Sequence, residues 1–148
     1  MLIIRDIYNV SNRKEAKCRA TVSYWEQVLF SWLIGNADMH LKNYSLYAPE
    51  GNEYQLTPAY DLLSTALVIP EDTEELALTL CGKKRKLTRQ HFLEAMTASR
   101  LDEKVCDNIF ARFQHIHPEW EACIRQSFLP EDMQRQYIEF ILLKFSQI

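Results

Sequence analysis

A stripe of large apolar side chains near the start of the chain most constrains how it can fold. Its members recur at the spacing of one face of an α-helix: Trp25, Val28, Leu29, Trp32 and Leu33. This spacing predicts a helix that buries one face in a core. Ser23 and Glu26 have the pattern of a capping box at a helix start, and Gly35 stands where the helix is expected to end. We therefore expect a helix over residues 23–34.

A polar stretch, Asn-Ala-Asp-Met-His-Leu-Lys-Asn over residues 36–43, follows this helix directly. It holds Asp38 and Asn43, and a second isolated aspartate, Asp61, comes later in the sequence Leu-Thr-Pro-Ala-Tyr-Asp-Leu. Between them, strand-like residues 44–47 and 53–56 flank the turn residues of 49–52, which predicts a β-hairpin. Closing the hairpin should bring Asn43 and Asp61 together.

Phosphoryl transfer requires side chains of these kinds. An aspartate orients or accepts the proton of the attacking hydroxyl, while an asparagine and a downstream aspartate bind magnesium. Asp38, Asn43 and Asp61 match these roles in order. Lys42 could place a positive charge beside the transferred group, and His40 could contact a phosphate or brace the loop. An alternative stays open, since Asn and Asp are also ordinary cap and turn residues.

Two segments of the chain resemble one kinase family. Residues 30–46 look like the catalytic loop, and residues 56–64 like the magnesium-binding segment, of the HipA-like serine/threonine kinases, the toxins of bacterial toxin–antitoxin systems. The resemblance covers roughly residues 22–148. It implies that Asp38 is the catalytic base and that Asn43 and Asp61 bind the metal. The residues that it places along the ATP phosphates are His40, Leu41, Lys42, Asn43, Tyr60 and Asp61.

The same resemblance implies the fold, the cofactors and the partners. The fold is the mainly helical C-terminal lobe of a kinase, with one small β-hairpin, and we expect it to span residues 21–148 after an irregular segment over residues 1–20. The cofactors are ATP and Mg²⁺. Protein substrates in this family include aminoacyl-tRNA synthetases, and the kinase usually has an antitoxin partner with a DNA-binding domain.

Four further helices are expected in the second half of the chain. Their starts are marked by Thr88, Asp102, Pro118 and Pro130. Before them, residues 76–80 form a short apolar run that predicts a buried strand or extended segment. Residues 82–86 follow as a basic turn, which we interpret as solvated, with contact to DNA or to a substrate as the alternative.

A complete kinase also needs a glycine-rich loop over the phosphates and a lysine from a nearby strand. Gly35 is the only glycine before Asp38. We therefore expect the chain to be an incomplete kinase with little activity alone: an excised fragment, half of a split kinase completed by another polypeptide, or a remnant that binds without catalysing. An apolar surface near the loop should then be exposed, for a separate N-terminal lobe or a second copy to cover.

Two alternative functions remain open. The chain could be a non-catalytic binding module that docks an antitoxin or a separate N-terminal lobe. It could also belong to a phosphotransferase for small molecules, because kinase-like folds also phosphorylate sugars and antibiotics. Nothing in the spacing of Asp38, Asn43 and Asp61 favours a protein substrate over a small molecule.

Composition excludes several other classes. The chain has 148 residues, enough for one domain, and its 47% hydrophobic content argues against disorder. A net charge of −3 does not indicate nucleic acid or an anionic membrane, and no apolar run is long enough to span a bilayer. Four scattered cysteines without a Cys-x-x-Cys pair predict reduced, buried thiols in the cytoplasm. His115 and His117 are interpreted as surface residues, not as metal ligands.

Overall fold

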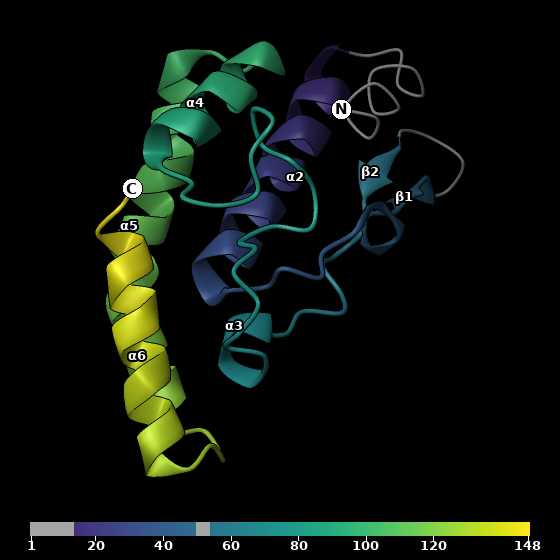
Figure 1. Ribbon diagram of the computed structural model, residues 1–148. Helices are drawn as coiled ribbons and strands as arrows, with labels where there is room; N and C mark the ends of the chain where they lie inside the picture. The colour runs from purple at the N-terminus through teal and green to yellow at the C-terminus, as the bar shows by residue number, and fades with distance from the viewer. Residues whose placement is uncertain (1–13, 50–53) are drawn as a thin grey trace.

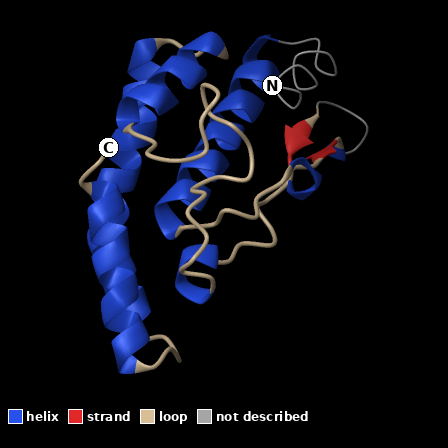
Figure 2. Cartoon of the chain, in the orientation of Figure 1, coloured by secondary structure: helices blue, strands red, loops and turns tan. Residues whose placement is uncertain are grey.

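The computed structural model describes residues 14–49 and 54–148, which are mainly helical with one small antiparallel sheet (Figures 1 and 2). This confirms the predicted fold class. The elements are α2 (Lys14–Ile34), the short 3₁₀ helix η1 (Leu41–Asn43), β1 (Leu46–Tyr47), β2 (Gln55–Leu56), α3 (Thr65–Val68), α4 (Arg89–Ala98), α5 (Glu103–Arg125) and α6 (Glu131–Phe145). Helix α2 lies between the hairpin on one side and helices α5 and α6 on the other (Figure 1).

Helix α2 is longer than the sequence pattern predicts. Its described part begins at Lys14, so the prediction of a start at Ser23 is wrong, and residues 14–20 are helical instead of irregular. The residues ahead of Ser23 include Lys, Glu, Ala and Arg, which are strong helix formers and carry the helix through the apparent cap. The rest of the segment 1–20 lies outside the described residues. The predicted end at Gly35 is confirmed, and this glycine has a φ of +74°.

The apolar stripe of α2 forms the centre of the core, as predicted. Trp25, Leu29, Trp32 and Leu33 are fully buried. The ring of Trp32 packs against Phe92 of α4 with 5.2 Å between ring centres. Large aromatic side chains contribute much of the apolar area that a small domain buries. The core therefore holds α2 rigidly, including the last turn that precedes residue 36.

Helix α5 continues through Pro118, so the prediction that this proline begins a separate helix is wrong. Proline within a helix removes one backbone hydrogen bond. Tertiary packing holds the helix together here, because Trp120, two residues beyond the proline, lies edge-on to three rings. They are Phe30, Phe113 and Phe145, at 5.3, 6.2 and 5.2 Å between ring centres.

The other three predicted helix starts are confirmed. The backbone N–H of Thr88 donates to Nδ1 of His91 at 3.1 Å, directly before α4. The N–H of Val105 donates to the carboxylate of Asp102 at 3.3 Å at the start of α5. Pro130 directly precedes α6. Side chains that bond the free N–H groups of a first turn define where a helix begins.

Leu76, Ala77 and Leu80 are buried, as expected for the apolar run 76–80. The run forms no strand, because the backbone bends at residues 77 and 78 and only Leu80 makes an isolated bridge, to Lys83. The basic turn closes with backbone hydrogen bonds between Leu80 and Lys83. The four cysteines are free, but only Cys106 is buried. The predicted burial is therefore wrong for the other three, which are exposed: Cys18, Cys81 and Cys123. In the described residues, no helix is both long and apolar enough to cross a membrane.

Candidate functional site

The loop that leaves α2 is held by a buried asparagine. Asn36 is completely buried, and its Oδ1 accepts the backbone N–H of Asp38 at 3.0 Å. Its Nδ2 donates to the backbone carbonyl of Asp61 at 3.5 Å. One side chain therefore ties the loop to the later segment that carries Asp61. Asn36 is not among the predicted site residues, although an Asn two residues before a functional Asp is typical of a turn in which the side chain bonds the backbone.

Thr65, at the start of α3, holds the same loop from another direction. Its hydroxyl donates to the carbonyl of Gly35 at 3.0 Å and accepts the N–H of Ala37 at 2.9 Å. The N–H of Ala66 also donates to the carbonyl of Gly35, at 3.0 Å. The first turn of α3 thus fixes both ends of the Gly35–Ala37 turn. Sequence reasoning missed Thr65, because a single threonine in a weak pattern gives no signal.

Asn43 and Asp61 meet, as the predicted hairpin requires. Asn43 is only 4% exposed, and its Nδ2 donates to Oδ2 of Asp61 at 3.1 Å and to the backbone carbonyl of Asp38 at 3.3 Å. The hairpin pairs Leu46 with Leu56, and this register draws the two ends together. Residues eighteen positions apart in sequence thereby share one hydrogen bond.

Asp61 adopts a backbone conformation that residues other than glycine rarely take. Its φ is +57°, in the left-handed region. Aspartate tolerates this region better than most residues, and such strain persists where surrounding contacts fix the residue. In this structure the side chain of Asn36 donates to the backbone carbonyl of Asp61, and the side chain of Asn43 donates to its carboxylate. The position of this carboxylate is therefore determined from two sides.

Asp38 presents its carboxylate to solvent. Its Oδ1 lies 3.2 Å from Nε2 of His40, and both side chains are 51% exposed. A substrate hydroxyl could therefore reach the carboxylate, with His40 beside it. Leu41 and Lys42 are also exposed, and in the part of the chain that the structure describes, the Lys42 side chain has no hydrogen bond or ion pair.

Tyr60 joins the loop to the segment that carries Asp61. Its hydroxyl donates to the backbone carbonyl of Lys42 at 2.8 Å, so it accepts from the Ser45 hydroxyl, which lies 2.8 Å away. The structure thus places Tyr60 beside the loop, where it braces the backbone. Of the six residues that sequence predicts along the phosphates, three have their polar side-chain groups bonded across the site: Asn43, Tyr60 and Asp61. Only Asn43 of the six is buried, and the other five are exposed.

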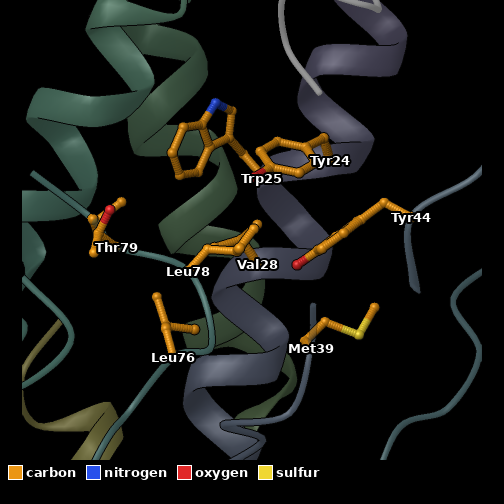
Figure 3. Close-up of a pocket in the computed structure, with 9 residues that line it drawn as sticks. Tyr24, Trp25, Val28, Met39, Tyr44, Leu76, Leu78 and Thr79 are labelled. Carbon is orange, nitrogen blue, oxygen red and sulfur yellow. The ribbon is translucent and has the colours of Figure 1, made fainter. Parts of the chain in front are cut away.

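Met39 anchors the loop of residues 36–43 against helix α2. It is 2% exposed and lies with Tyr44 beside Tyr24 and Val28 of α2, around an apolar cavity of about 20 Å³ (Figure 3). The rings of Tyr24 and Tyr44 are 5.0 Å apart, and burial raises the pKa of both hydroxyls. This cavity has room for about one water molecule. The cavity is therefore too small for a nucleotide, whereas the side chains of Asp38 and His40 are open to solvent.

The side chains present fit a magnesium ion. Mg²⁺ takes oxygen ligands, commonly one or two from protein and the rest from phosphates and water. With Nδ2 of Asn43 bonded to Asp38 and Asp61, its Oδ1 has no partner within the described residues, and Asp61 has a carboxylate oxygen to spare. Those residues hold no cluster of three His, Cys, Asp or Glu side chains that could bind a metal. The site therefore suits a cation that takes most of its ligands from a nucleotide.

Comparison with known proteins identifies the family of the chain. The sequence profile of a family described as "HipA-like C-terminal domain" matches residues 3–120. The chain belongs to this family. The motifs suggested a resemblance over residues 22–148. The family match begins earlier, at residue 3, and ends earlier, at residue 120, before α6.

Two relatives of this HipA-like chain carry kinase names. It is 36% identical over 110 residues to "Putative kinase Y4dM" of Sinorhizobium fredii, an alignment that covers 73% of this chain and 27% of that protein. It is 33% identical over 42 residues to "Putative kinase" of Haemophilus influenzae, covering 28% of this chain and 12% of that protein. The chain thus spans about a quarter or less of the length of the curated relatives it matches.

Proposed function

We propose that the chain is the C-terminal lobe of a HipA-like serine/threonine protein kinase of a toxin–antitoxin system. The observation that carries the proposal is the hydrogen bond of 3.1 Å between Asn43 and Asp61, formed directly beside the backbone of Asp38. An asparagine and a distant aspartate joined beside an exposed aspartate is the arrangement that kinases use for magnesium and for the attacking hydroxyl.

Each residue then has a definite task. Asp38 orients the substrate hydroxyl and accepts its proton, and His40 lies within 3.2 Å to hold that carboxylate in place. Asn43 and Asp61 would hold Mg²⁺, which when bound with ATP neutralises charge on the phosphates. Lys42 lies exposed beside the loop, where its charge can attract the phosphates. Tyr60 keeps the loop backbone in position through Lys42.

The parts that grip ATP are proposed to come from outside these 148 residues. Gly35 is the only glycine ahead of Asp38, and its left-handed turn is bonded to α3, so it cannot serve as a phosphate loop. Alone, the chain should bind Mg·ATP weakly and transfer phosphate poorly. In the complete assembly the substrate would be a protein serine or threonine, for example in an aminoacyl-tRNA synthetase, and the partner an antitoxin with a DNA-binding domain.

Exposed apolar side chains beside the site favour a second candidate function, that of a docking module. Leu41, Leu62 and Leu63 are 37, 38 and 40% exposed, next to Asn43 and Asp61 in the chain. Apolar groups gathered on one surface commonly mark an interaction site. A separate N-terminal lobe or an antitoxin could cover them whether or not the site performs catalysis.

A titration with Mg·ATP tests the primary proposal. The ¹⁵N spectrum of the chain should change at residues 38–43 and 60–65 when ATP and Mg²⁺ are both present, and much less with ATP alone. Asp61→Asn should remove the magnesium dependence. Asp132→Asn is the matched control, because Asp132 is an exposed carboxylate in the first turn of α6. Equal responses in Asp61→Asn and in the unaltered chain would refute the metal assignment.

Phosphate transfer from labelled ATP separates the two candidate functions. A catalytic role predicts that Asp38→Asn loses transfer in the complete kinase but keeps Mg·ATP binding, since Asp38 contributes no ligand to the metal. A docking role predicts that Asp38→Asn changes neither the assembly nor its effect on cells.

A further inference from the structure

Helix α6 holds the last turn of α2, directly before the candidate site. The hydroxyl of Tyr137 donates to the backbone carbonyl of Ile34 at 3.0 Å. One turn along α6, Phe140 packs against Gly35 so closely that a Cβ there would lie 2.8 Å from the ring. Helix α6 lies beyond the residues matched by the family, so neither contact follows from the family match.

The Ile34 carbonyl needs a partner for a physical reason. The last four carbonyls of a helix have no partner within the helix. At this end of α2, Ser31 accepts from the N–H of Asn36 and Trp32 accepts from the N–H of Gly35. Ile34 is buried, and its carbonyl is taken by Tyr137. Burial raises the pKa of the Tyr137 hydroxyl, so it remains a donor throughout the neutral range.

We propose that Tyr137 is a positioning residue of the candidate site, which fixes the direction in which the chain leaves α2 and thereby the meeting of Asn43 with Asp61. The route is short and continuous. Ile34 is two residues from Asn36, whose side chain bonds both the Asp38 N–H and the Asp61 carbonyl. Asn43 then bonds Asp38 and Asp61. A shift of the Ile34 peptide is transmitted to both segments of the site.

The effect of Tyr137 must be separated from simple loss of stability. Helix α6 is also joined to α2 by Lys144, which packs over the Trp32 ring and pairs with Glu75 at 3.3 Å. Removing one hydroxyl should therefore leave α6 docked. Tyr137→Phe is the suitable change, because it keeps the ring and removes only the donor.

The experiment compares three variants of the full chain by ¹⁵N NMR without metal or nucleotide. The readout is the side-chain amide of Asn43, assigned by its loss in Asn43→Asp. Tyr137→Phe should shift or broaden this signal. Ile109→Val, a buried change in α5, controls for lost stability, and Tyr47→Phe, at an exposed tyrosine of β1, controls for loss of a hydroxyl elsewhere. Both controls should leave the Asn43 signal in place.

A second readout is the affinity for Mg·ATP, which Tyr137→Phe should lower about tenfold, as changes to residues that orient metal ligands do. The proposal is overturned if Tyr137→Phe leaves the Asn43 amide unchanged, or if Ile109→Val moves it as much. This inference rests on the proposed function only for what the site binds. If the unaltered chain does not bind Mg·ATP, the proposed function fails. The Asn43 amide signal, recorded without metal, still decides whether Tyr137 positions the site.

Discussion

Replacing Gly35 with alanine should destabilise the protein through two separate effects. The first is backbone strain, because Gly35 has a φ of +74°, and an L-residue there costs about 1–2 kcal/mol. The second is steric. A Cβ would lie 2.7 Å from Cβ of Ala66 and 2.8 Å from Cζ of Phe140, and such overpacking costs about 1–3 kcal/mol.

The steric effect is hard to relieve. Phe140 could rotate, but Ala66 is held because its own N–H donates to the Gly35 carbonyl at 3.0 Å. Alanine also restricts the unfolded chain, which offsets about 0.4–1 kcal/mol. The net loss should be about 1–5 kcal/mol of unfolding free energy, which at its upper end is a large share of the stability of a typical domain.

Gly82 provides a control for the backbone effect. Its φ is +76°, but a Cβ there would meet nothing within 4 Å. Gly82→Ala should therefore cost only about 1 kcal/mol, the strain less the offset. Urea unfolding of both variants gives the two losses under identical conditions. If Gly35→Ala falls within about 0.5 kcal/mol of Gly82→Ala, a difference of the size expected from neutral changes, the close packing of α3 and α6 on this turn is refuted.

Three further predictions concern the contacts that hold the helices. Lys144→Met should lower the unfolding free energy in urea by about 1–3 kcal/mol, because it leaves Glu75 partly buried without its cation. Lys104→Met, at an exposed lysine of α5, is the control, and an equal loss in both variants would contradict this prediction. Burial acts to raise the Glu75 pKa, but hydrogen bonds from Trp32 and Leu87 and the charge of Lys144 hold it below its usual value. The Glu75 carboxylate therefore stabilises the fold fully above its unfolded pKa, and this contribution is lost as the pH falls through its folded pKa. Glu75→Gln should then reduce the dependence of unfolding free energy on pH below about pH 5. An unchanged pH dependence would contradict this prediction. Asp102→Ala should cost about 1 kcal/mol in thermal unfolding through loss of the α5 cap, whereas Asp107→Ala, farther along α5, should cost less.

The sequence predicts the meeting of Asn43 and Asp61 because the signals involved are local. A helical stripe ends at Gly35, turn residues define the hairpin, and closure of any hairpin brings its ends together. Family resemblance then assigns roles that spacing alone leaves open. The fold class follows from the same helical periodicity, since α4, α5 and α6 all begin next to a recognisable signal.

The predictions that fail do so because a competing local preference or a distant contact outweighs the signal. Ser23 and Pro118 carry local signals for a helix start, yet both lie within helices whose length is set by neighbouring helix formers and by packing around Trp120. Thr65 and Tyr137 support the site through hydrogen bonds to residues 28 and 103 positions away. Nothing in the nearby sequence of either residue indicates such a partner.

Paramagnetic Mn²⁺ tests the central claim most directly, because it can replace Mg²⁺ beside ATP and broadens only the NMR signals near the metal. With Mn·ATP, we expect the broadening to centre on Asn43 and Asp61, to reach Asp38 and Tyr60, and to disappear in Asp61→Asn. Broadening centred on another group of acidic residues, such as those at the start of α6, or broadening that survives in Asp61→Asn, would contradict the assignment of this loop and hairpin as a phosphoryl-transfer site.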